Sequence, residues 1–202
     1  MADITLTPRS ALAPFLHVGH YGADGKSSVT LREVTPVSLV ELTAFQNKKS
    51  ELAANVHARL GVALPAANKT SSIEGLTIIS IAPGKWILVG ERSDDKNLVN
   101  SLQTAVGTLG AVVDQSDARA IVEISGPHAR KALEKGVMID LDPVNLLTGD
   151  AATSFAVQFW ITLWKTSDLP SYRIAVFRSL GRDLLHWLES SAAEYGLTIS
   201  KT

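Results

Sequence analysis

The stretch RAIVEISGPHARKALEKGV, residues 119–137, contains the signals on which the predicted fold depends. Apolar residues recur at every second position from Ala120 to Ile124, which is typical of one face of a β-strand. Gly126-Pro127 interrupts this pattern, and proline suits the first position of a helix because its missing N–H costs nothing there. Apolar residues then follow at helical spacing: Ala129, Leu133 and Val137. The stretch therefore predicts a strand, a tight turn and a helix.

The chain beyond this stretch continues with two strands, a helix and a strand. A long apolar run predicts one strand from Phe155 to Trp164, and Tyr172 to Phe177 predicts the strand that returns beside it. A helix is expected from Ser179 until Gly196 stops it. The last strand is expected at residues 197–199.

The chain before this stretch predicts the same order of elements. Residues 29–42 have a strand pattern, and a helix follows Asn47 and ends at Gly61. Two strands at residues 76–89 form a predicted hairpin around Pro83-Gly84. A second helix is indicated by apolar residues at 98–109, and a short strand by residues 111–113.

The two parts align with each other at an offset of 86 residues, which indicates an internal repeat. The aligned pairs are Trp86 with Tyr172, Leu88 with Ile174, Leu98 with Leu184, Leu102 with Leu188, Gly110 with Gly196 and Val113 with Ile199. We therefore predict an α+β fold of two ferredoxin-like halves, each β-α-β-β-α-β, packed as one body. The predicted divisions are an extended N-terminal arm at 1–27, a first half at 28–115 and a second half at 117–201.

The long predicted strand has apolar side chains on both faces. Phe155 is expected on one face, and Trp160 and Trp164 on the other. Because helices cover only one face of a ferredoxin-like unit, the tryptophan face should be covered by the other half or by another chain. Trp160, Trp164 and Phe15 of the arm are the candidates for contact with a partner.

The composition excludes several classes of protein. The 202 residues include 19 basic and 20 acidic side chains, and this near-neutral balance argues against a nucleic-acid-binding protein. The absence of cysteine excludes disulfides, thiolate zinc sites and cysteine nucleophiles. No apolar run approaches the roughly 18 residues that cross a membrane, and no signal peptide is indicated. We therefore expect a cytoplasmic protein with no membrane association.

The candidate functional residues are few. Arg119, Arg173 and Arg178 could bind an anionic ligand, although a structural ion pair with Asp114 or Asp117 near the join of the halves is the favoured interpretation for this region. His17 and His20 have a ligand-like spacing, but no third ligand lies nearby. We predict no metal site and no catalytic residue in this chain.

Several motifs resemble the gamma subunit of heterotetrameric sarcosine oxidase. The resemblance covers nearly the whole chain and is densest between residues 112 and 196. It departs from the family pattern at Ala11, Ala118 and Thr148. The matching motifs are Arg9-Ser10-Ala11-Leu12-Ala13-Pro14, Pro83-Gly84-Lys85-Trp86, Val113-Asp114-Gln115-Ser116-Asp117-Ala118-Arg119, Ser125-Gly126-Pro127-His128-Ala129, Ile139-Asp140-Leu141-Asp142-Pro143 and Phe177-Arg178-Ser179.

That family is similar to the folate-binding domain of glycine cleavage T-protein, an aminomethyltransferase. The shared pieces here are Asp114-x-Ser116, Arg119 and Gly126-Pro127-x-Ala129. This relation implies the fold predicted from the repeat. It does not transfer the folate site, because the hairpin after Trp164 contains only Asp168 where T-protein has an acidic pair.

The resemblance implies a non-catalytic gamma subunit that assembles with alpha, beta and delta subunits. The whole complex oxidises sarcosine to glycine and passes a one-carbon unit to tetrahydrofolate. The family's cofactors, FAD, FMN, NAD, tetrahydrofolate and zinc, are expected on the other subunits, and none on this chain. The alternative is a free-standing folate-binding or one-carbon protein, in which the three arginines would pair with a glutamate tail of folate.

Overall fold

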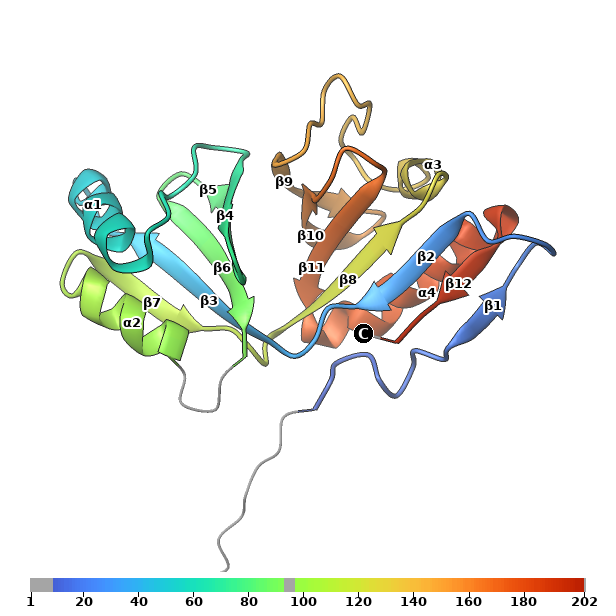
Figure 1. The fold of residues 1–202 in the computed structure, drawn as a ribbon, viewed down its shortest axis with the longest axis horizontal. Helices are drawn as coiled ribbons and strands as arrows, with labels where there is room; N and C mark the ends of the chain where they lie inside the picture. Colours follow the sequence, from blue (N-terminus) through green and yellow to red (C-terminus); the bar gives the residue numbers. More distant parts are fainter. Residues whose placement is uncertain (1–8, 93–96, 202) are drawn as a thin grey trace, which may run out of the picture.

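The computed structural model describes residues 9–92 and 97–201. Two β-sheets face each other, and helices cover the outer face of each sheet (Figure 1). Helices α1 and α2 lie outside the smaller sheet, and α3 and α4 lie outside the larger one. The described chain contains no helix that is both long and apolar enough to span a membrane.

The smaller sheet follows the predicted order of elements in the first half. Its strands are arranged in the order β4-β5-β6-β3-β7, with β4 as an additional edge strand. Gly61 adopts the left-handed conformation that ends the first helix, as its position predicts. The elements are β3 (Val37–Ala44), α1 (Lys49–Leu60), β4 (Thr70–Ile73), β5 (Leu76–Ala82), β6 (Lys85–Glu91), α2 (Asn97–Val106) and β7 (Gly110–Asp114).

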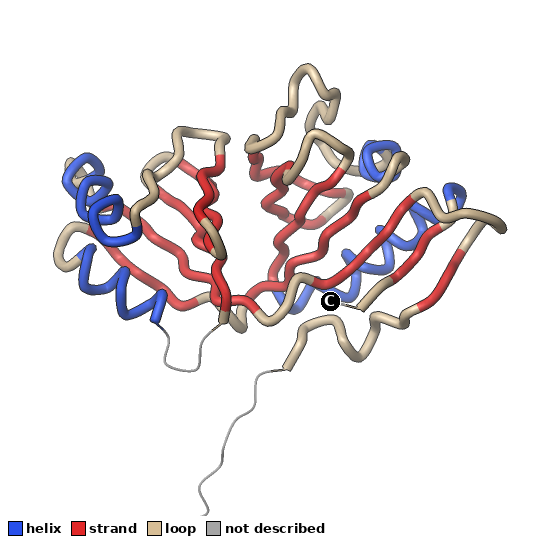
Figure 2. Tube along the Cα trace, viewed as in Figure 1, coloured by secondary structure: helices blue, strands red, loops and turns tan. Residues whose placement is uncertain are grey.

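The larger sheet contains seven strands in the order β1-β12-β2-β8-β11-β10-β9. Its two outermost strands on one side, at the right of Figure 2, come from opposite ends of the chain, as the colours of Figure 1 show. Its elements are β1 (Gly19–Tyr21), β2 (Val29–Glu33), β8 (Arg119–Ser125), α3 (Ala129–Glu134), β9 (Ala151–Ala156), β10 (Phe159–Lys165), β11 (Ser171–Phe177), η1 (Arg178–Leu180), α4 (Gly181–Ala192), η2 (Ala193–Tyr195) and β12 (Leu197–Ile199).

Strand β2 lies in the larger sheet, although the strand pattern at 29–42 was expected to belong wholly to the first half. The pattern is interrupted at Pro36, and β2 inserts between β12 and β8 while β3 enters the smaller sheet. Val29 and Leu31 pack into the core beneath α3 and α4. The border between the sheets therefore does not coincide with residue 28. Residues 1–8 of the expected arm lie outside the described residues.

The predicted long strand from Phe155 to Trp164 is wrong, because this run forms the hairpin of β9 and β10. Val157 has a φ of 55°, and Ala156 pairs with Phe159 across the turn. Phe155 consequently pairs with Trp160 on the same face, and their rings meet edge to face with centroids 4.6 Å apart. The run has neither glycine nor asparagine at the turn, so its sequence lacked the usual hairpin signal.

The sheets are joined by a third apolar core between their inner faces. This inter-sheet core combines side chains of both sheets, among them Leu39 and Ile87 of the smaller sheet and Ile121 of the larger. Trp164 belongs to it and is only 2% exposed. The expectation that the other half covers this face is confirmed at Trp164. The prediction that Trp164 contacts a partner is therefore wrong, because the same chain buries its ring.

Candidate functional site

A small polar cavity, which we call the junction pocket, lies where the arm meets the two linkers between the sheets. Its volume is about 70 Å³. Its walls come from the arm, the end of β2 and the β2–β3 linker, the residue after β6, the β7–β8 turn, the start of β8 and the residue after β11. Three of the sequence motifs meet here, although they are far apart in the chain. The charged residues that line the pocket are Arg9, Glu33, Arg92, Asp117, Arg119 and Arg178.

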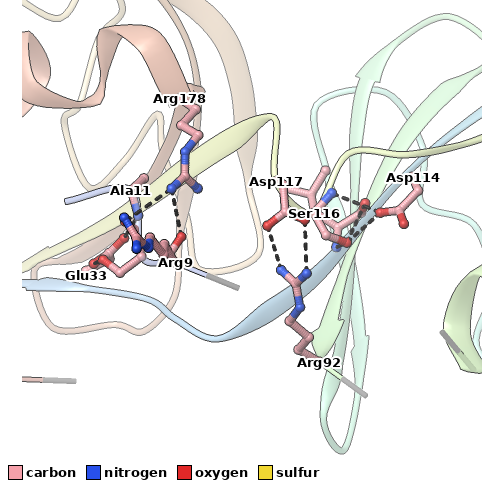
Figure 3. A network of polar contacts seen from close by, with 10 residues as sticks. Arg9, Ala11, Glu33, Arg92, Asp114, Ser116, Asp117 and Arg178 are labelled. Carbon is pink, nitrogen blue, oxygen red and sulfur yellow. Dashed lines mark hydrogen bonds and ion pairs between the residues drawn. The ribbon is translucent and has the colours of Figure 1, made fainter. Parts of the chain in front are cut away.

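Glu33 and Arg178 hold the arm in place from opposite sides (Figure 3). The carboxylate of Glu33 accepts hydrogen bonds from the Ser10 hydroxyl and from the backbone N–H groups of Ala11, at 3.1 Å, and Leu12, at 3.2 Å. The guanidinium of Arg178 donates to the carbonyl oxygen of Arg9 at 2.7 Å and to that of Ser10 at 3.2 Å. These bonds position Leu12, whose side chain is fully buried in the core of the larger sheet.

The β7–β8 turn is fixed by side chains of the motif at 113–119. Asp114 accepts hydrogen bonds from the backbone N–H and the hydroxyl of Ser116, at 3.0 and 2.6 Å. The Leu39 N–H donates to the same hydroxyl at 3.0 Å, which ties the turn to β3. Serine at this position thus connects the turn to the first half.

Arg92 forms a two-pronged ion pair with Asp117 across the junction. Its two terminal nitrogens lie 2.9 and 3.0 Å from the two carboxylate oxygens (Figure 3). The hydrogen bond from Arg92 is the main cause that holds the pKa of Asp117 below its usual value. The predicted structural ion pair at the join is present, but its partner is Arg92, which the sequence reasoning did not identify.

The side chain of Arg119 is only 10% exposed and faces Glu41 on β3 of the smaller sheet. Its guanidinium lies 4.8 Å from the centroid of the Phe177 ring, and its nearest carboxylate oxygen, on Glu41, is 3.7 Å away. Burial lowers the pKa of Arg119 from its ordinary value, and Glu41 partly offsets this effect. Within the described residues, the buried Nε of Arg119 has no hydrogen-bond partner.

Arg173 lies away from the junction pocket, in an ion-pair triad. Its Nε donates to one oxygen of Glu123 at 2.9 Å, and the Nε of Arg32 donates to the other at 2.8 Å. Burial raises the pKa of Glu123. The hydrogen bonds and charges of the two arginines together lower it by more, so the pKa lies below its usual value. The structure therefore brings Arg119 and Arg178 to one pocket and places Arg173 elsewhere.

Two of the three predicted partner-contact residues, Trp160 and Phe15, are exposed. Trp160 is 48% exposed and its ring meets that of Phe155, which is 41% exposed; we call this aromatic pair the hairpin patch. Phe15 is 39% exposed and lies beneath the guanidinium of Arg182, at 5.4 Å. Whether either site touches a partner stays a prediction.

The described residues contain no cluster of three or more histidine, aspartate or glutamate side chains suited to a metal ion. His17 lies beside His186 and Glu189 in the wall of one cleft, whereas His20 bonds to Ser27 and to the carbonyl of Ala23. The two histidines thus have different surroundings.

Comparison with known proteins identifies the family. The model of the "Sarcosine oxidase, gamma subunit family" matches residues 46–194. The chain belongs to this family. The sarcosine oxidase subunit gamma of Corynebacterium sp. strain U-96 is 30% identical over 174 residues, which cover 85% of this chain and 82% of that protein. The gamma subunit from Arthrobacter sp. is 27% identical over 203 residues, covering 96% of this chain and 97% of that one.

Solved structures agree with this assignment to the gamma subunit family. A chain of the heterotetrameric sarcosine oxidase from Corynebacterium sp. U-96 superposes with a TM-score of 0.80 at 28% identity, over 93% of this chain and 96% of that one. The glycine cleavage aminomethyltransferase T from Bartonella henselae superposes with a TM-score of 0.60 at 15% identity, over 88% of this chain and 48% of that one. The similarity to T-protein is therefore one of fold.

Proposed function

We propose that this chain is the non-catalytic gamma subunit of a heterotetrameric sarcosine oxidase. The observation that carries the proposal is the match to the chain of the Corynebacterium enzyme over almost the full length of both. The complex would oxidise sarcosine to glycine in the cytoplasm and transfer the one-carbon unit to tetrahydrofolate. The flavins, NAD, folate and zinc would reside on the alpha, beta and delta subunits.

The bonds of the junction pocket support a structural role for this chain. Glu33 and Arg178 bond to the arm, and Asp117 bonds to Arg92. These charged side chains hold segments of the chain together, as expected of a subunit whose role is to offer a fixed surface to its partners. The alternative of a free-standing folate-binding protein has less support, because Arg173 is separated from Arg119 and Arg178 and is paired with Glu123.

We also infer that the halves are ferredoxin-like repeats. Strands β3, β5, β6 and β7 and helices α1 and α2 follow the β-α-β-β-α-β order, and so do β8, β10, β11 and β12 with α3 and α4. In the second unit, β2 is inserted between the first and last strands. The hairpin patch would then be a contact surface for another subunit, since exposed apolar surfaces of this kind mark interaction sites.

Co-expression with the other three subunits tests the proposed function. We expect the chain to co-purify with them in a complex that oxidises sarcosine, and the isolated chain to be colourless and inactive. A bound flavin, or sarcosine turnover by the isolated chain, would refute the non-catalytic assignment. Failure to join the complex would refute the gamma-subunit assignment.

A double variant tests the contact surface separately. Phe155→Ser with Trp160→Ser removes the aromatic pair of the hairpin patch, and we expect weaker co-purification while the fold is retained. Phe45→Ser is the matched control, because Phe45 is an aromatic residue that is 51% exposed and lies outside both the patch and the arm. Equal co-purification of both variants would show that the hairpin patch is not an interface.

A further inference from the structure

Among the described residues, the lining of the junction pocket carries more positive than negative charge, and Glu41, which lies outside the lining, partly balances Arg119. Four arginines line it, against two carboxylates. Both carboxylates are already engaged, since Glu33 accepts hydrogen bonds from the arm and Asp117 pairs with Arg92. The pocket therefore resembles a site prepared for a further anionic group.

Two of the arginines have unmet bonding capacity. Arg178 donates from one terminal nitrogen to two carbonyl oxygens, which do not neutralise its charge, and no described carboxylate lies within 4.0 Å of its guanidinium. Its charge does reach Asp117, whose pKa it helps to lower. Arg119 has only Glu41 at 3.7 Å, and its Nε has no partner among the described residues. A guanidinium has five N–H donors and matches the two oxygens of a carboxylate.

The size of the pocket limits the group that it can receive. A volume of about 70 Å³ is far below the roughly 300–1,000 Å³ of pockets that enclose small-molecule ligands. It suits a single carboxylate head group.

We propose that the junction pocket receives the carboxylate of one aspartate or glutamate side chain from a neighbouring subunit, with Arg119 and Arg178 as its donors. This inference rests on the proposed function, because it requires an assembled complex. A side chain is favoured over a free ligand because the pocket holds only a head group. The pocket also lies where the arm meets the two linkers between the sheets, so a partner's side chain bound there would contact the arm and both linkers.

Titration of the purified full-length chain with sodium acetate tests the chemistry of the pocket without any partner. We expect saturable shifts of the Arg119 and Arg178 Nε–H signals in ¹⁵N NMR spectra, with half-saturation in roughly the millimolar range for so small a ligand. Sodium chloride at equal ionic strength should not reproduce these shifts. Arg119→Gln should abolish them, and Arg173→Gln is the matched control that retains them.

A second variant distinguishes loss of acetate binding from loss of folding. Arg119→Lys keeps the charge but lacks the planar fork, so we expect acetate to bind it several-fold more weakly. Circular dichroism establishes that each variant is folded. Absence of acetate-specific shifts in the wild-type chain, or unchanged shifts in both Arg119 variants, would overturn the proposal.

Assembly with the other subunits then distinguishes the source of the carboxylate. We expect Arg119→Gln to weaken association at least tenfold, whereas Arg173→Gln has little effect. If acetate binds but Arg119→Gln assembles normally, the pocket serves a free carboxylate and the partner assignment is overturned. If the wild-type chain does not assemble, the proposed function fails while the acetate result still stands.

Discussion

Single residues of this protein act mainly by tying together segments that are distant in the chain. Glu123 is the clearest example, because it lies on β8 and pairs with Arg32 on β2 and Arg173 on β11. Its side chain is 13% exposed, so solvent screens these pairs only partly. The triad joins three neighbouring strands of the larger sheet on the face that points toward the smaller one.

The pH dependence of stability should reveal this triad. The folded-state pKa of Glu123 lies below its ordinary value of 4.5, so its stabilising effect is present above pH 4.5 and is lost as the pH falls through the lowered pKa. We expect Glu123→Gln to reduce the free energy of unfolding by about 1–3 kcal/mol at pH 7. The gap between wild type and variant should shrink as the pH falls below about 4.5, because the unfolded wild-type chain then binds a proton that the folded carboxylate does not, and it should close once the folded carboxyl is protonated as well.

Urea denaturation at a series of pH values measures this gap. Glu51→Gln is the control, since Glu51 pairs with Lys48 on an exposed helix surface and should show little pH-dependent difference. A gap for Glu123→Gln that stays constant down to pH 3 would contradict the assignment of the effect to the carboxylate charge.

The elements were largely predictable where a local signal marked their ends. Gly61 ends α1, and Gly196 directly precedes β12, as the sequence indicates. The β9–β10 hairpin was missed because Val157 occupies a left-handed position that glycine or asparagine usually fills. The alternation of apolar residues continues from Phe155 to Leu163 without a break, although the turn changes which face each side chain takes, so the sequence indicated one strand instead of two.

The strained turn leads to a prediction about the hairpin. A β-branched residue in the left-handed region costs roughly 1–2 kcal/mol, whereas asparagine adopts this region readily. We expect Val157→Asn to increase the free energy of unfolding by about 0.5–1 kcal/mol, because Val157 is 45% exposed and loses little burial. Gln158→Asn, at the neighbouring position of the same turn, is the control. Chemical denaturation that shows a less stable Val157→Asn variant would disprove the strain.

At the scale of the whole molecule, the two tryptophans of β10 have different surroundings. Both point toward the same face of the strand, yet Trp164 is 2% exposed in the inter-sheet core and Trp160 is 48% exposed beside Phe155. The smaller sheet covers only one end of the strand's inner face. Trp164 therefore joins the halves, and Trp160 remains available to another subunit.

Alanine substitution should separate these functions. We expect Trp164→Ala to lower the free energy of unfolding by about 3–5 kcal/mol, as for other buried aromatic residues. Trp160→Ala should cost no more than about 1.5 kcal/mol, the upper range for one aromatic pair. Thermal and urea denaturation measure both, and equal losses for the two variants would contradict the assignment of Trp164 to the core between the sheets.

The sequence by itself indicated the α+β class of fold and the family. These properties depend on local periodicity, on glycines that end elements, and on motifs that are contiguous in the chain. The tertiary structure alone decided that β2 joins the larger sheet, that Phe155 meets Trp160, and that the motifs at 9–14, 113–119 and 177–179 form one pocket. The physical reason is that strand pairing and the docking of linkers join residues that are far apart in sequence. The alternation of apolar side chains indicates that a segment is a strand, but it does not indicate which strand pairs with it.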